Sequence, residues 1–259
     1  MRQRNLTEGN ITKNLLFFAF PMMAGNLLQQ CYNIADTLIV SRFLGANALA
    51  AVGSSYTLMT FLTSILLGMC MGSGAAFSIW YGQKDRKRLK EGMVHAFGLI
   101  AAVTIVLNVL VFAGLPLILR LLQVPTEVTP YMEEYLKIIF AGISATFLYN
   151  YYAALLRAIG NSVVPLVFLG VSAVLNIILD FLFVFTFQRG VGGAAEATVI
   201  AQFVSGIGIA FYTQKYFPEL RVSLKEIHFK GKMLNEIAGF SFLTCMQQSI
   251  MNFGILMVQ

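Results

Sequence analysis

The sequence predicts an all-α, polytopic membrane protein, and two observations support that prediction. Hydrophobic residues make up 58% of the chain and charged residues only 12%, about half the charged share of an ordinary soluble domain. Apolar runs of about twenty residues or more recur along the whole chain, and about that length is needed to cross a bilayer as a helix.

Seven apolar runs follow one another, and each is a predicted membrane span. They cover residues 14–40, 47–81, 91–120, 131–157, 162–187 and 191–216, and a seventh runs from residue 233 to the end. The seventh run weakly repeats the first at an offset of 222 residues, where a second set of six spans would begin. We therefore expect a six-helix N-terminal lobe at 1–216, a cytoplasmic connector at 217–232 and, at 233–259, the truncated start of a C-terminal lobe that is missing here.

The distribution of Lys and Arg predicts the orientation of the spans. With the N-terminus in the cytoplasm, 14 of these basic residues fall in inside segments and 3 in outside segments, which is the asymmetry of the positive-inside rule. The net charge of +6 lies in loops between spans, and no basic face with interleaved aromatic residues is present. The sequence thus argues against nucleic acid as a partner.

The first predicted span carries a polar stripe that ends in an acid. Asp36 is the only charged residue between 14 and 40, and a carboxylate at the centre of a membrane helix costs about 2.5–3.5 kcal/mol on insertion scales. Gln29, Tyr32 or Asn33, and Asp36 recur at three- and four-residue spacing, so they share a helix face. Such an acid favours an ion or substrate pathway. Pro21 in the same span predicts a kink at which the helix can bend.

The fifth predicted span holds a second acid at a similar depth. Asn176 and Asp180 are one turn apart on an otherwise apolar helix, and both acid-bearing spans run outward, so Asp36 and Asp180 fall in the same outer half of the membrane. The sixth span begins near that face, and its Thr198 and Gln202 are expected to reach the same cavity. We therefore expect the two acids to face one cavity and to titrate as a coupled unit.

Several motifs together resemble the MATE (multidrug and toxic compound extrusion) family. They are the first span with Pro21 and residues 29–36, followed by 41–46, 49–53, 156–161, 176–180 and 190–198. The resemblance implies twelve helices in two six-helix lobes and the export of organic cations or drugs in exchange for H⁺ or Na⁺. The presence of both acids is similar to the DinF-like and archaeal-type branch.

The resemblance also implies roles for individual residues. Binding of the coupling proton or cation is implied for five of them, namely Asp36, Asp180, Asn176, Tyr32 and Thr198. A Na⁺ ion would use the oxygens of Asp36, Asn176, Asp180 and Thr198, which suit a hard cation. Gln29, Asn33 and Gln202 are weaker candidates for the substrate cavity, and Pro21 for a hinge. No cofactor is expected beyond the coupling ion, and the choice between H⁺ and Na⁺ stays open.

Two other functions deserve comparison with antiport. A lipid-linked saccharide flippase of the same superfamily fold would be expected to hold several basic residues in its cavity, whereas Lys137 is the only base placed within a predicted span. An intramembrane aspartyl protease needs a Gly-x-Gly-Asp loop, which neither acid has, so no enzyme is expected. Membrane lipid is an expected partner. The three cysteines without paired spacing favour a bacterial or archaeal plasma (inner) membrane.

Overall fold

The computed structural model describes residues 11–222 and 230–258 of the chain and confirms the all-α class. Its described residues contain no strand. The elements are α1 (Ile11–Leu44), α2 (Ala46–Gly82), α3 (Arg86–Leu121), α4 (Thr129–Ala141), α5 (Ile143–Ala158), α6 (Val163–Asp180), the π-helical turn η1 (Phe181–Thr186), α7 (Gly190–Tyr216), the short η2 (Pro218–Leu220) and α8 (Gly231–Val258).

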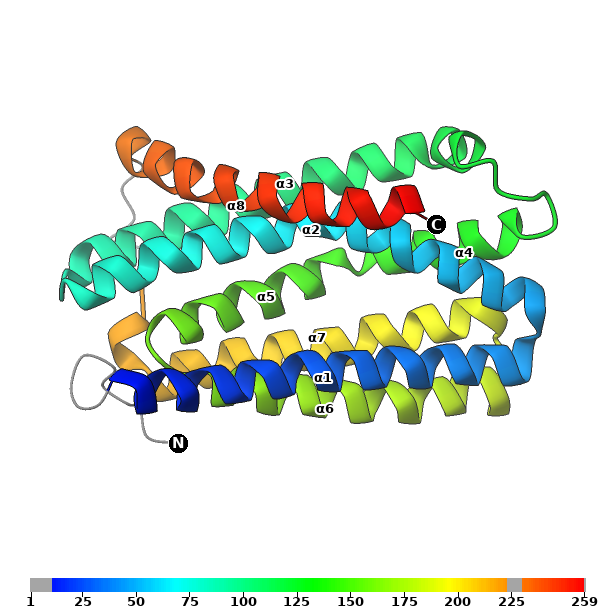
Figure 1. Cartoon of the computed structure of the whole chain (residues 1–259), viewed down its shortest axis with the longest axis horizontal. Helices are drawn as coiled ribbons and strands as arrows, with labels where there is room; N and C mark the ends of the chain where they lie inside the picture. The colour runs from blue at the N-terminus through cyan, green and yellow to red at the C-terminus, as the bar shows by residue number, and fades with distance from the viewer. Residues whose placement is uncertain (1–10, 223–229, 259) are drawn as a thin grey trace.

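The long helices form two layers that run along the same axis (Figure 1). One layer holds α2, α3 and α8, the other holds α1, α6 and α7, and α5 crosses between them. Helices α1 and α8 begin at the same end of the bundle and run in the same direction, as expected of a seventh span that follows six crossings.

By length and composition, four helices are apolar enough to cross a membrane: α2, α3, α6 continued by η1, and α7. The pair α4 and α5 adds a fifth when it is counted as one bent span. Helix α1 runs alongside these spans, but its polar stripe at residues 26–36 lowers its mean hydropathy. Helix α8 likewise carries polar side chains through its length. The chain is a multi-pass membrane protein.

The fourth predicted span is wrong in one respect, because it is not a single helix. It is broken at Gly142 into α4 and α5, which meet at a bend of 48°. A side chain at Gly142 would overlap that of Val199, so α7 packs directly against the break. The amide Nδ2 of Asn108 donates to the backbone oxygen of Phe140 at 2.6 Å, which satisfies a carbonyl next to the break inside the apolar bundle.

Helix α8 packs against α2 at a close crossing of small residues. Gly68 and Gly72 lie one turn apart on α2, and a Cβ at Gly72 would be 2.5 Å from the backbone oxygen of Phe240. Beside them, the Oγ atoms of Ser73 and Ser241 are 3.3 Å apart. The spacing of these glycines predicts close helix packing, and the structure confirms it.

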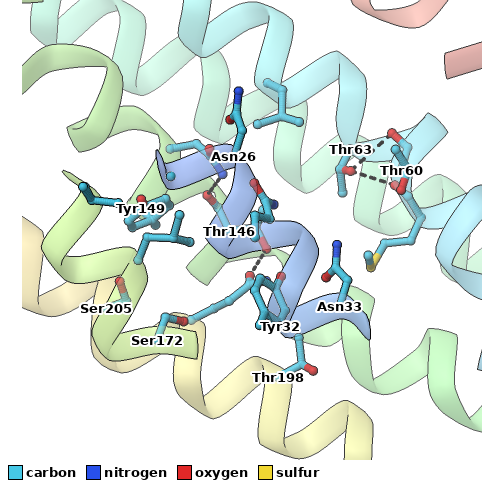
Figure 2. A pocket seen from close by; sticks show the side chains of 18 of the residues that line it. Asn26, Tyr32, Asn33, Thr60, Thr63, Thr146, Tyr149, Ser172, Thr198 and Ser205 are labelled. Atoms are coloured by element: carbon cyan, nitrogen blue, oxygen red, sulfur yellow. Dashed lines mark hydrogen bonds between the residues drawn. The ribbon is translucent and has the colours of Figure 1, made fainter. Parts of the chain in front are cut away.

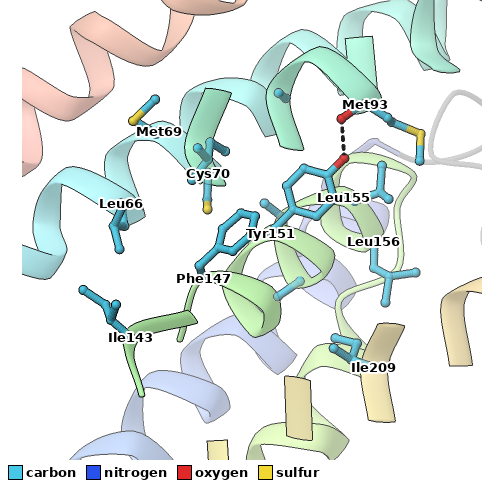
Figure 3. Packing of buried hydrophobic residues seen from close by; sticks show 14 of the residues in the cluster. Leu66, Met69, Cys70, Met93, Ile143, Phe147, Tyr151, Leu155, Leu156 and Ile209 are labelled. Carbon is cyan, nitrogen blue, oxygen red and sulfur yellow. Dashed lines mark hydrogen bonds between the residues drawn. The ribbon is translucent and has the colours of Figure 1, made fainter. Parts of the chain in front are cut away.

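The main apolar core lies where α2, α3 and α5 meet (Figure 3). Tyr151 is buried there against Phe147, and its hydroxyl donates to the backbone oxygen of Met93 at 2.7 Å. The hydrogen bond removes the cost of burying a phenol among apolar side chains. This core fixes α5 between the two layers and so positions the wall of the cavity described below.

Candidate ion and substrate site

The two acids meet at the junction of α1 and α6. Asp36 is 9% exposed and Asp180, the last residue of α6, is fully buried. Their carboxyl groups lie close enough to interact with each other. The expected proximity of the two acids is therefore present in the fold. The π-helical turn η1 follows Asp180 directly, and such wide turns are frequent at functional sites.

The oxygens around the acid pair lack donors. Among the described residues, no hydrogen-bond partner reaches Oδ1 of Asp36, Oδ1 of Asn176 or either carboxyl oxygen of Asp180. Thr198 orients the side-chain amide of Asn176, because Thr198 Oγ1 accepts a hydrogen bond from Asn176 Nδ2 at 3.2 Å. A buried acceptor without a donor costs about 1–3 kcal/mol, and more when it is charged. This group of acceptor oxygens fits a proton shared by the acids or a hard cation.

Two tyrosines border the acid pair. Tyr32 lies one turn before Asp36 on α1 and within electrostatic range of its carboxyl group. Tyr135 of α4 is buried and lies within range of Asp36, Asp180 and Tyr32. The sequence pattern missed Tyr135, because the residue sits in an apolar run whose packing against α1 depends on the break at Gly142.

A cavity of about 320 Å³ lies beside the acid pair, between α1, α2, α5, α6 and α7. Figure 2 shows polar side chains from these helices around it, among them Tyr32, Asn33, Thr146, Tyr149 and Thr198. Several are fixed by hydrogen bonds. Asn33 Nδ2 donates to the Tyr56 hydroxyl at 3.2 Å, and the Thr146 hydroxyl donates to Gln202 Oε1. The lining offers amide and hydroxyl groups along an otherwise apolar wall.

Most of the sequence-predicted site residues line this cavity, but the acids do not. The lining includes Pro21, Gln29, Tyr32, Asn33, Thr198 and Gln202. Asp36, Asn176 and Asp180 are not part of it, so the expectation that the acids face the cavity needs correction. The cavity reaches Ser172 on α6, whereas Asn176 and Asp180 lie one and two turns further along that helix. Tyr32 and Thr198 line the cavity and also touch the acid site, because Tyr32 lies within electrostatic range of Asp36 and Thr198 accepts a hydrogen bond from Asn176.

The charge of the cavity wall is the feature that the sequence pattern did not reveal. Arg157, in the last turn of α5, is the one charged residue among the described residues that line the cavity. In the sequence, Arg157 belongs to the motif at 156–161 and to the basic residues that predict orientation, and neither feature indicates a cavity. Lys137, the base placed within a span, is exposed and pairs with Glu133 at 2.6 Å, away from the cavity.

Comparisons with known proteins agree on the family. A profile of the MatE family matches residues 21–182. The chain is 36% identical over 219 residues to the probable multidrug resistance protein YpnP of Bacillus subtilis, which covers 83% of this chain and 48% of that protein. It is 27% identical over 251 residues to the probable multidrug resistance protein NorM of Thermotoga maritima, covering 95% and 54%. The chain spans about half the length of these relatives.

Solved structures share the fold. A MOP superfamily transporter from Pyrococcus furiosus, described as having a binding pocket of reverse polarity, superposes with a TM-score of 0.89 at 24% identity, over 96% of this chain and 55% of that one. A MATE structure in a bent conformation superposes with a TM-score of 0.86 at 25% identity, covering 93% and 54%. With the family profile matching more than half of its residues, this chain belongs to the MatE family.

Proposed function

We propose that the chain is one lobe of a secondary active transporter that exports drugs or organic cations by antiport with H⁺ or Na⁺. The observation that carries the proposal is the group of buried acceptor oxygens on Asp36, Asn176 and Asp180, which has no donors among the described residues. Two ionised carboxylates side by side repel each other, and binding of a proton or a sodium ion relieves that repulsion. The multidrug resistance proteins to which the chain is similar support export as the direction.

The route from ion binding to drug release runs through α1 in this proposal. Asp36 and the cavity-lining Pro21, Gln29 and Tyr32 are all on this helix, so a change at the acid pair is transmitted along one element. Pro21 interrupts the backbone hydrogen bonding and is the hinge. Similar MATE structures exist in a bent and in a straight conformation, which supports bending within this fold. Coupling requires that ion and drug favour different conformations.

A flippase for lipid-linked saccharides is the alternative, and the cavity argues against it. A pyrophosphate-linked lipid needs several cations, whereas the lining holds Arg157 alone. We propose that the protein lies in a bacterial or archaeal plasma membrane with its N-terminus in the cytoplasm and that a C-terminal lobe completes the transport path. Because that lobe would close the cavity, residues 1–259 alone should give no efflux.

The test is efflux from vesicles that contain the two-lobe protein. A fluorescent cation is loaded, and a proton gradient alone and then a sodium gradient alone is applied. One of the two gradients should drive export, and an ionophore that collapses it should stop export. If efflux is the same with either gradient applied as with no gradient at all, the proposal is contradicted.

A further inference from the structure

Arg157 is an unbalanced charge at one end of the cavity. Its side chain is partly buried, and none of the described residues forms a hydrogen bond or an ion pair with its guanidinium group. Tyr149 lies within electrostatic range of it, and the Tyr149 hydroxyl is already used as a donor to the backbone oxygen of Pro165 at 3.0 Å. A guanidinium group that points at a polar cavity without a counter-ion is available for a ligand anion.

The other basic groups near helix ends are different. Arg189 pairs with Glu196 at 2.6 Å, Lys230 with Glu91 at 2.7 Å, and Arg88 with Glu236 at 2.7 Å. Arg120 offers the closest match to Arg157, because it too stands in the last turn of its helix, but it does not line the cavity. A place in the last turn of a helix thus accounts for a basic residue at both positions. Of the two arginines, only Arg157 lines the cavity.

The acid pair lies toward the opposite end of the site. Ser162, which lines the cavity with Arg157 and follows it by five residues, caps the start of α6, and Asp180 ends that helix. Ser162 and Asp180 are therefore separated by about 27 Å at 1.5 Å per residue. The lining of α6 extends from Ser162 to Ser172, about 15 Å of that length. The long axis of the cavity therefore runs from Arg157 at one end toward the acid pair, which lies beyond the other end.

We propose that the Arg157 end of the cavity is a subsite for a carboxylate, so that the transporter prefers zwitterionic amphiphiles to pure cations of the same shape. The inference rests on the proposed drug-binding function and adds the substrate class. Arginine suits this task because its planar guanidinium group binds a carboxylate through two parallel hydrogen bonds. The cationic end of such a solute points toward Tyr32 and the acid pair.

Two dyes test the subsite directly. Rhodamine 110 carries a free carboxylate, and rhodamine 123 is its methyl ester, so the pair differs only in that group. Binding of each dye to the purified two-lobe protein in phosphatidylcholine nanodiscs is measured by fluorescence polarisation. Wild-type protein should bind rhodamine 110 about tenfold more tightly than rhodamine 123, as expected for one hydrogen-bonded charge pair.

Substitutions assign the difference to Arg157. Arg157→Gln should weaken binding of rhodamine 110 about tenfold and leave rhodamine 123 within about twofold. Arg157→Lys keeps the charge but loses the planar fork, so its affinity for rhodamine 110 should be intermediate. Arg120→Gln should change the affinity for neither dye. Circular dichroism of each variant checks that the helices remain folded.

The outcomes separate the two proposals. If both dyes bind and Arg157→Gln affects them equally or not at all, the carboxylate subsite is wrong and the drug cavity stands. If neither dye binds to wild-type protein, the drug-binding function is wrong as well. In phosphatidylglycerol nanodiscs Arg157→Gln should still weaken the binding of rhodamine 110 selectively. The disappearance of this effect there would assign the subsite to a lipid phosphate and overturn the solute assignment.

Discussion

The carboxyl groups of Asp36 of α1 and Asp180 of α6 lie close enough to interact, and no described residue donates to either oxygen of Asp180. When both acids are ionised, each faces a like charge inside an apolar bundle. A shared proton or a bound cation is the simplest way to satisfy both. This relationship explains why two acids persist in spans where a single unpaired one is costly.

The hydroxyl of Thr198 should set the affinity of the acid pair for its ion. Thr198 Oγ1 accepts a hydrogen bond from Asn176 Nδ2 at 3.2 Å, so Oδ1 of Asn176 faces away from Thr198. Thr198→Val keeps the shape but removes this acceptor, which costs about 1–3 kcal/mol. The ion concentration for half-maximal efflux should rise about tenfold. Thr198→Ser should stay close to wild type, and an unchanged Val variant would contradict this role.

Packing of α8 on α2 should fail when Gly72 gains a side chain. A Cβ there meets the backbone of Phe240 and Ser241, which cannot move aside easily. Overpacking costs about 1–3 kcal/mol, so Gly72→Ala should lower the Tm in detergent by several degrees. Gly53 on the same helix has open space around it, and Gly53→Ala should leave the Tm unchanged or raise it slightly. Equal Tm values for both variants would show that the crossing is loose.

The orientation of the chain is testable with single cysteines. The native Cys31, Cys70 and Cys245 are first replaced, and Lys87→Cys and Thr126→Cys are introduced one at a time at exposed positions. Because the asymmetry of Lys and Arg predicts a cytoplasmic N-terminus, an impermeant maleimide added to intact cells should label position 126 and spare position 87. The reverse pattern would invert the topology.

Much of the fold could be predicted, because it depends on local composition. Apart from the break between α4 and α5, the apolar runs locate the long helices to within about five residues, and the positions of Asp36 and Asp180 follow from helix direction and depth. The close α2–α8 crossing follows from Gly68 and Gly72, whose spacing by itself indicates a tight contact. These features need no knowledge of which helices are neighbours.

The features that escaped prediction depend on contacts between distant segments. The break at Gly142 lies in a continuous apolar run, and Val199 of the distant helix α7 packs against it. The cavity lining on α6 ends at Ser172, before Asn176 and Asp180, and this depends on how the neighbouring helices pack there. Arg157 belongs to the cavity only because α5 crosses between the two layers, so its charge alone indicated no more than topology.

In the proposed mechanism Asp36 and Asp180 act as one ion site, and ion-driven efflux from vesicles of the two-lobe protein tests this most directly. Asp36→Asn, Asp180→Asn and the double variant should all reduce efflux to the rate of empty vesicles, because a site that acts as a unit is lost with either member. Glu196→Gln, which changes an acid held by Arg189 outside the site, should retain most of the rate. Normal ion-driven efflux by Asp180→Asn would contradict the shared site.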